Sequence, residues 1–452
     1  MFRSEYQISF KSPLLQHLVA LLSGVIIGLN LLPASLIMLM VFGTAMLVLI
    51  HGFIGKTETA FAWLPYLCYI EVYCRDKIME IPYLFLPYFF VLYFVMMLVK
   101  QWPVLHFHNR SFFFLFLFVV VEIVNGSRTK DPEYARFLIT NSVALFFVAL
   151  WASCNVLSNK EINRLLYNLK LAGIFTCGII LVSQLTHNIS YGTYSMSEAM
   201  NGLAPVQISA YLGLCSILYF LSIMQQQGKL MFIINTASFF LSTTFLALSF
   251  SRGGLYFLTA VIGLYFLFNY KKVSNIYLLF ILVPLAFLAY TFTIETTHGV
   301  ILERYNDTNT SGRSVLIDAG ISLFSMNPIF GVGTANFNDA IFENNLYHIT
   351  SGAHNEFIRV IAEHGLCGAI PYYLFYLSTI IGILKRKKSW FQMGVFFLVL
   401  FILIIIHNGL KISIQPIILL VIIATPYELL RVFANQKKEQ IQDTKEQNLA
   451  AI

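Results

Sequence analysis

Residues 112–124 read FFFLFLFVVVEIV and are apolar at almost every position. A strand of a membrane barrel alternates apolar and polar side chains, so this run is typical of a helix in an apolar surrounding instead. The whole chain shares the bias: 58% of its 452 residues are apolar and only 11% are charged. So little polar surface cannot cover a soluble globule. The sequence therefore predicts an all-α polytopic membrane protein.

A membrane-spanning helix needs about 20 mainly apolar residues, and by that measure we expect about 12–14 spans. The candidates are residues 13–30, 33–51, 59–73, 82–100, 111–125, 135–158, 164–185, 203–225, 230–250, 253–270, 275–295, 366–385, 389–409 and 413–432. Segments 59–73 and 111–125 are short, but losing both would leave the two termini on the same sides. The start of the chain is similar to a signal sequence; because a second span follows at once, we interpret it as an uncleaved first helix.

The distribution of lysine and arginine among the loops predicts the orientation of the chain in the membrane. With a cytoplasmic N-terminus, most of the 29 lysines and arginines, including the cluster at 385–388, face the cytoplasm, as the positive-inside rule requires. The net charge of +7 then reflects basic loops and predicts no nucleic-acid partner. We expect transmembrane helices over 1–295, a large periplasmic loop with short helices and the active-site residues over 296–365, three final spans over 366–432, and a disordered cytoplasmic tail over 433–452.

Metal-binding and disulfide patterns are weak. The six cysteines are scattered without paired spacing, which predicts neither disulfides nor a metal site. Asp131-Pro132-Glu133 has the acidic spacing that could hold a divalent cation, but Lys130 and Arg136 flank it, which favours a solvated, salt-bridged loop. We expect no metal and no cofactor.

The first polar segment that could carry chemistry is Ser251-Arg252-Gly253-Gly254, between an outward-running and an inward-running span. Ser251 could cap the second helix, whose N-terminus presents free N–H groups and a partial positive charge. Gly253 and Gly254 would let a bulky anion approach the backbone. The alternative is an interfacial arginine in a tight turn.

Arg313 has a similar setting. Ser311 and Gly312 precede a helix over 314–324 whose apolar positions form one face, and the helix ends at Asn327-Pro328, before Gly331-Val332-Gly333. This pattern predicts an amphipathic helix on the membrane surface with a cation at its start. Arg304 is a weaker candidate, because no capping residue surrounds it. A solvated arginine is the alternative in both cases.

His354 follows Ser351-Gly352 at a further predicted helix start, with Asn355 beside it, and the helix continues to Gly365. The field of a helix N-terminus disfavours an imidazolium, so a neutral imidazole able to accept a proton is favoured. The alternative is an ordinary surface histidine. Two arginine-bearing helix starts and one with histidine, on one face of a bilayer, could bind a diphosphate.

Taken together, these segments resemble the O-antigen ligase and polymerase superfamily of bacterial envelope proteins. The matching residues are Ser251-Arg252-Gly253-Gly254, Ser311-Gly312-Arg313, the segment 327–333, Ala353-His354-Asn355-Glu356-Phe357, and the segment 365–368. The resemblance covers about residues 240–385, and the N-terminal half agrees only in being a series of spans.

The resemblance implies a glycosyltransferase of the GT-C-like fold in the bacterial inner membrane. Its donor would be a glycan on undecaprenyl diphosphate, and its acceptor a lipid-linked glycan or the lipid A core at the periplasmic face. By position, the catalytic residues would be Arg252 and Arg313, which bind the diphosphate, and His354, which activates the acceptor hydroxyl. Arg304 and Asn355 are further substrate-binding candidates. We expect inverting transfer; whether the chain is an O-antigen or exopolysaccharide polymerase or an O-antigen ligase stays open.

A membrane transporter or polysaccharide flippase without glycosyltransferase chemistry is the other class that we weigh. Such proteins usually carry ionisable residues within their spans. Most spans here lack them in the middle, although Glu71 and Glu122 lie near span ends and His407 could face the bundle.

Overall fold

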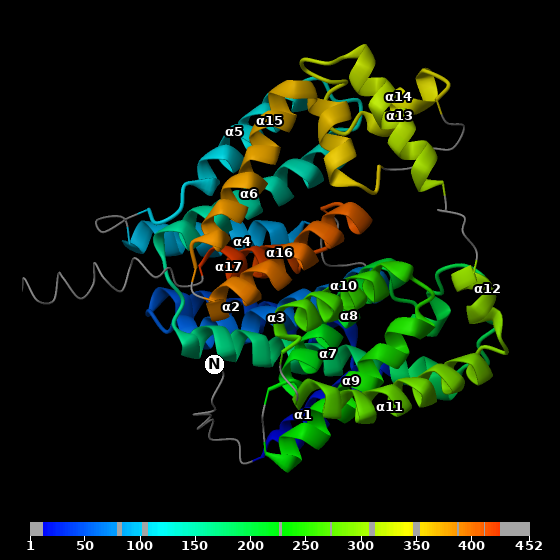
Figure 1. Cartoon of the computed structure of the whole chain (residues 1–452). Helices are drawn as coiled ribbons and strands as arrows, with labels where there is room; N and C mark the ends of the chain where they lie inside the picture. Colours follow the sequence, from blue (N-terminus) through cyan, green and yellow to red (C-terminus); the bar gives the residue numbers. More distant parts are fainter. Residues whose placement is uncertain are drawn as a thin grey trace, which may run out of the picture.

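The structure, a computed structural model, describes residues 12–78, 84–101, 107–225, 228–271, 274–306, 312–346, 353–386, 388–410 and 412–424. Ser311, Ser351, Gly352 and the expected tail 433–452 lie outside these residues. Over the described residues every regular element is helical and none is a strand, which confirms the predicted all-α class (Figure 1). Eight of the described helices are long and apolar enough to cross a membrane, and three shorter described helices are apolar as well.

Most helices follow the predicted segments, but the last, Gln415–Ile423, covers only part of the segment 413–432, whose residues 425–432 lie outside the described part of the chain. In chain order the α-helices are α1 (Pro13–Gly28), α2 (Ala34–Phe53), α3 (Thr57–Tyr73), α4 (Phe85–Gln101), α5 (Ser111–Gly126), α6 (Pro132–Cys154), α7 (Asn159–Thr186), α8 (Pro205–Ile223), α9 (Lys229–Leu248), α10 (Arg252–Asn269), α11 (Ser274–Thr296), α12 (Val300–Asn306), α13 (Arg313–Met326), α14 (Phe337–Glu343), α15 (Glu356–Leu384), α16 (Lys388–Asn408) and α17 (Gln415–Ile423). A π-helical turn, η1 (Cys74–Ile78), extends α3, and a 3₁₀ turn, η3 (Glu198–Met200), precedes α8.

Small residues let neighbouring helices approach closely. Where α1 packs against α7, a Cβ at Gly24 would lie 2.0 Å from the Phe175 carbonyl oxygen, and one at Gly178 would lie 2.2 Å from that of Leu21. Lipid is as apolar as leucine, so tight backbone packing through small residues is a main source of helix association in a membrane.

Gly254 has the same packing role between α10 and α8. A Cβ there would lie 2.2 Å from the Ser209 carbonyl oxygen, and Gly213 of α8 faces Gly254 in return. The expectation that Gly254 leaves room for an anion is therefore wrong, because the backbone of α8 fills that space. Instead, the glycine fixes where the start of α10 lies.

The segment between α11 and α15 contains the shorter helices α12, α13 and α14, of which α13 and α14 lie together at one corner of the molecule (Figure 1). The predicted helix over 314–324 is confirmed by α13, whose last residue is Met326 and whose C-cap is Asn327. Leu316, Ala319 and Leu323 form its buried face, whereas Val315 is 41% exposed. α13 packs on α15 through this face, so its first residue, Arg313, has a fixed place.

Helix α15 is interrupted at Gly365, which has a positive φ of 56°. The loop that follows α13 fills the break: Leu366 N donates to Pro328 O at 2.8 Å, and Val332 N donates to Ala362 O at 3.0 Å. A Cβ at Gly365 would lie 2.6 Å from the Ile329 carbonyl. The break thus joins the apolar part of α15 to the segment that carries α13.

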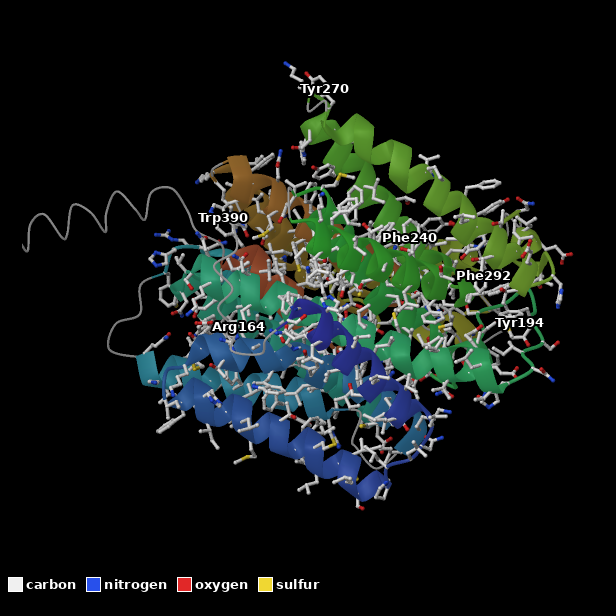
Figure 2. The ribbon with its side chains drawn as sticks, turned by 90° about the horizontal axis from the view of Figure 1, so that it is seen from below. Arg164, Tyr194, Phe240, Tyr270, Phe292 and Trp390 are labelled. Atoms are coloured by element: carbon white, nitrogen blue, oxygen red, sulfur yellow. The ribbon has the colours of Figure 1, made fainter. Side chains whose placement is uncertain are left out.

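The helix ends lie at the two opposite ends of the bundle, as expected if successive helices cross the membrane in alternate directions. In Figure 2, Arg164, near the start of α7, and Trp390, near the start of α16, lie toward one end of the bundle. Tyr194, shortly after α7, and Phe292, near the end of α11, lie toward the opposite end. This arrangement agrees with helices that run up and down through a multi-pass membrane protein.

Candidate active site

Arg252 is the first residue of α10 and is tied to α12. Its Nη2 donates to the Arg304 carbonyl oxygen at 2.6 Å, while Arg304 Nε donates to the Phe250 carbonyl oxygen at 3.2 Å. Phe250 has a positive φ of 55°, which turns the chain before the helix. Ser251 occupies the N-cap position but its hydroxyl makes no capping bond; it lies 2.9 Å from Ser209 Oγ instead. The predicted cap is therefore wrong, because that hydroxyl joins α10 to α8.

Arg313 begins α13 and comes close to the other two arginines. Burial lowers the pKa of its guanidinium; Tyr256 opposes this effect, and the positive charges of Arg304 and Arg252 lower the pKa further. An arginine still stays charged under such conditions. Its hydrogen-bond partner is His407 near the end of α16, whose Nδ1 faces Nη1 and whose Nε2 lies 3.5 Å from Nη2.

His354 precedes α15 and has a backbone conformation that non-glycine residues seldom adopt. Its φ is 51°, and Asn355 N donates to the Ala353 carbonyl oxygen across it at 2.5 Å. The Asn355 side chain caps α15, accepting from Phe357 N at 3.0 Å. Such strain costs about 1–3 kcal/mol and clusters at functional sites. The chain just after His407 passes this turn, because a Cβ at Gly409 would lie 4.0 Å from the His354 carbonyl oxygen.

The predicted residues thus converge from four elements. Arg252 comes from α10, Arg304 from α12, Arg313 from α13 and His354 from the turn before α15, and all four are half-buried, with some surface still open. His407, by contrast, is 7% exposed. Three guanidinium groups can together neutralise a diphosphate, and an imidazole in the same region can accept a proton.

Tyr305 is a neighbouring residue that the sequence did not single out. Its hydroxyl is buried and has no hydrogen-bond partner among the described residues. Burial raises the pKa of this phenol, while the charges of Arg304 and Arg252 act in the opposite sense. A protonated hydroxyl beside two arginines is a further donor for an anionic ligand.

A buried ion cluster holds the start of α15. Arg359 donates from Nε to Glu356 at 2.9 Å, from Nη1 to Glu363 at 2.5 Å, and from Nη2 to Glu122 of α5 at 2.8 Å. These four side chains are at most 4% exposed. Because Glu356 and Glu363 lie three and four positions from Arg359, the sequence could have predicted their ion pairs on one helix face. Nothing in the sequence relates Glu122 to Arg359.

The acidic residues considered for transport are both held in ion pairs. Glu122 contacts Arg359, and Glu71 lies 3.4 Å from Arg75 and accepts from Ser413 Oγ at 3.1 Å. Each therefore has a structural role in joining helices. His407 does face the bundle, and its neighbour is Arg313.

The acidic segment at 131–133 serves as a helix start. Asp131 Oδ1 accepts from Tyr134 N at 3.0 Å and caps α6, while the adjacent Lys130 pairs with Glu343 at the surface. Within the described part of the chain, no group of three or more histidine, cysteine, aspartate or glutamate side chains could hold a metal ion.

Residues 237–373 match a protein-family model described as O-antigen ligase. The matched segment begins in α9 and ends in α15, so it includes Arg252, Arg313 and His354 but not His407. A comparison with curated proteins finds no match.

Proposed function

We propose that this chain, whose residues 237–373 match the O-antigen ligase family model, is a member of the O-antigen ligase and polymerase superfamily. In this proposal it transfers a glycan from undecaprenyl diphosphate to a sugar acceptor. The family indicates a glycosyl-transfer enzyme, and the apolar helices make it a multi-pass membrane protein. The donor, the inverting course and the face of the membrane are our proposals.

The observation that carries the proposal is the convergence of Arg252, Arg304 and Arg313. These residues lie up to 61 positions apart in the sequence. Hydrogen bonds join Arg252 to the segment of Arg304, and the His407 ring that faces Arg313 lies against Gly253, the residue after Arg252. Grouping like charges is unfavourable unless something of opposite charge binds among them. Arginine suits a diphosphate because its planar fork donates two parallel hydrogen bonds to phosphate oxygens.

In the proposed reaction, His354 removes the proton from the acceptor hydroxyl as that oxygen attacks the anomeric carbon. A new carbon–oxygen bond forms on one side while the bond to the diphosphate oxygen breaks on the other, so the configuration inverts. The electron pair leaves with undecaprenyl diphosphate, whose charge Arg252 and Arg313 stabilise. His354 then returns its proton to water. Diphosphate is a good leaving group, so alignment and charge neutralisation are the protein's main contributions.

We place the site at the periplasmic face of the inner membrane. The support is the basic cluster at 385–388, which the positive-inside rule assigns to the cytoplasm, together with the segment 296–365 at the other helix ends. The acceptor there would be a second lipid-linked glycan for a polymerase or the lipid A core for a ligase. Both acceptors expose sugar hydroxyls to the same base.

The proposal is tested by glycan analysis of cells that carry only variant protein. We expect His354→Ala to abolish glycan transfer, and Arg252→Ala and Arg313→Ala to reduce it through weaker donor binding. The exposed Arg136→Ala is the matched control and should behave as wild type. Normal glycan chains with His354→Ala would contradict the base assignment, and movement of donor across vesicles without transfer would favour the flippase.

A further inference from the structure

His407 lies where the elements of the proposed site meet, although it is outside the matched family segment. It is the second-last residue of α16, which packs beside α10. Its ring packs edge-on against Phe257 of α10, with centroids 5.9 Å apart and planes at 85°. A Cβ at Gly253 would lie 2.1 Å from its Cδ2. This fit requires a glycine directly after Arg252 and fixes the position of the imidazole.

The polar edge of the same ring faces Arg313, with Nδ1 toward Nη1 and Nε2 3.5 Å from Nη2. A guanidinium can only donate hydrogen bonds, so Nδ1, the His407 nitrogen closer to it, must accept. The chain then continues past the start of α15: a Cβ at Gly409 would lie 4.0 Å from the His354 carbonyl oxygen and 3.6 Å from Glu356 Oε2.

We propose that His407 is a positioning residue, which holds the Arg313 guanidinium against the start of α10 so that Arg313 and Arg252 grip one pyrophosphate group together. The inference rests on the proposed function for the identity of the lipid. Its physical basis is that a long arginine side chain loses less rotamer freedom on binding when a buried acceptor already fixes it. His407 itself makes no contact with the reacting atoms.

Binding of undecaprenyl diphosphate to purified full-length protein in nanodiscs tests this inference without requiring turnover. His407→Leu removes the acceptor, and we expect the Kd to rise about tenfold, the effect of losing one hydrogen bond to a charged group. His407→Asn can present an amide oxygen near the place of Nδ1 and should restore most of the affinity. A merely structural role would predict no such difference between the two variants.

A pair of glycines in α10 provides the matched control. Gly253→Ala should weaken binding as His407→Leu does, because the added methyl group displaces the imidazole. Gly263→Ala, with nothing within 4 Å of its Cβ, should leave the Kd unchanged. Thermal unfolding of each variant identifies any that misfold. If a His407 variant misfolds, the comparison of the Kd of Gly253→Ala with that of Gly263→Ala tests the role of His407 instead.

The outcomes separate this inference from the proposed function. If the wild type binds the lipid and His407→Leu binds it equally well, or His407→Asn binds as weakly as His407→Leu, the role of His407 is refuted. If the wild type binds with the expected variant pattern but transfers no glycan, only the proposed reaction fails. A wild type that does not bind undecaprenyl diphosphate refutes both.

Discussion

Replacing Arg359 by methionine perturbs the buried ion cluster that anchors the start of α15. Methionine keeps much of the side-chain volume but removes four charged hydrogen bonds to three carboxylates, those of Glu356, Glu363 and Glu122. Three carboxylates would then remain buried without their cation. Removing one partner of a buried pair costs roughly 3–5 kcal/mol, and the contributions of the individual bonds are not additive. We therefore expect a destabilisation of at least ~3 kcal/mol.

Thermal unfolding of detergent-purified protein measures this effect. At ~2 °C per kcal/mol for a long chain, the apparent Tm should fall by roughly 6–10 °C. The exposed Arg136→Met is the matched control and should shift the Tm by less than ~1 °C, because it breaks no buried pair. Adding Glu122→Gln, Glu356→Gln and Glu363→Gln to Arg359→Met should recover part of the loss, since neutral amides are less costly to bury than carboxylates.

A Tm for Arg359→Met within 2 °C of the wild type would contradict this expectation. It would mean that the carboxylates take up protons or water at little cost and that Arg359 does not anchor the helix. Activity should fall along with the Tm, because Glu356 lies two residues after His354 and the cluster fixes the turn that presents this histidine.

Two further predictions concern stability. Gly365→Ala should destabilise the protein by roughly 2–5 kcal/mol, because its φ is 56° and the new Cβ would lie 2.6 Å from the Ile329 carbonyl; a Tm equal to that of Gly263→Ala would contradict the tight packing at the break in α15. Lys130→Ala should change the stability by less than about 1 kcal/mol, since its ion pair with Glu343 joins side chains that are 53% and 55% exposed; a loss as large as that of Arg359→Met would show that burial is not what distinguishes the two ion pairs.

Much of the fold was predictable because the apolar runs are long and their ends are polar. The predicted span 111–125 became α5 (Ser111–Gly126), and 230–250 became α9 (Lys229–Leu248). The sequence predicted one helix up to Gly365 and a separate span from residue 366, and the structure does break α15 at Gly365. It did not predict that the loop after α13, about 30 to 38 residues earlier, would hydrogen-bond to this break. Long-range partners of this kind have no local pattern.

The sequence singled out the candidate residues but not the contacts between them. Arg252, Arg313 and His354 were recognisable because polar groups at helix starts are conspicuous in an apolar chain. His407 was noticed only as a histidine that could face the bundle, since its partner Arg313 lies 94 positions away. Gly253 and Gly254 were expected to admit an anion, but their neighbours are the His407 ring and the backbone of α8.

We propose that two arginines and a histidine act together on one lipid diphosphate. Glycan transfer by purified protein in proteoliposomes tests this, with a defined undecaprenyl-diphosphate glycan, a sugar acceptor and EDTA present. We predict that the wild type releases undecaprenyl diphosphate and extends the acceptor with inverted linkage, and that His354→Ala binds the donor but gives no product. Transfer by His354→Ala at the wild-type rate would show that His354 is not the base.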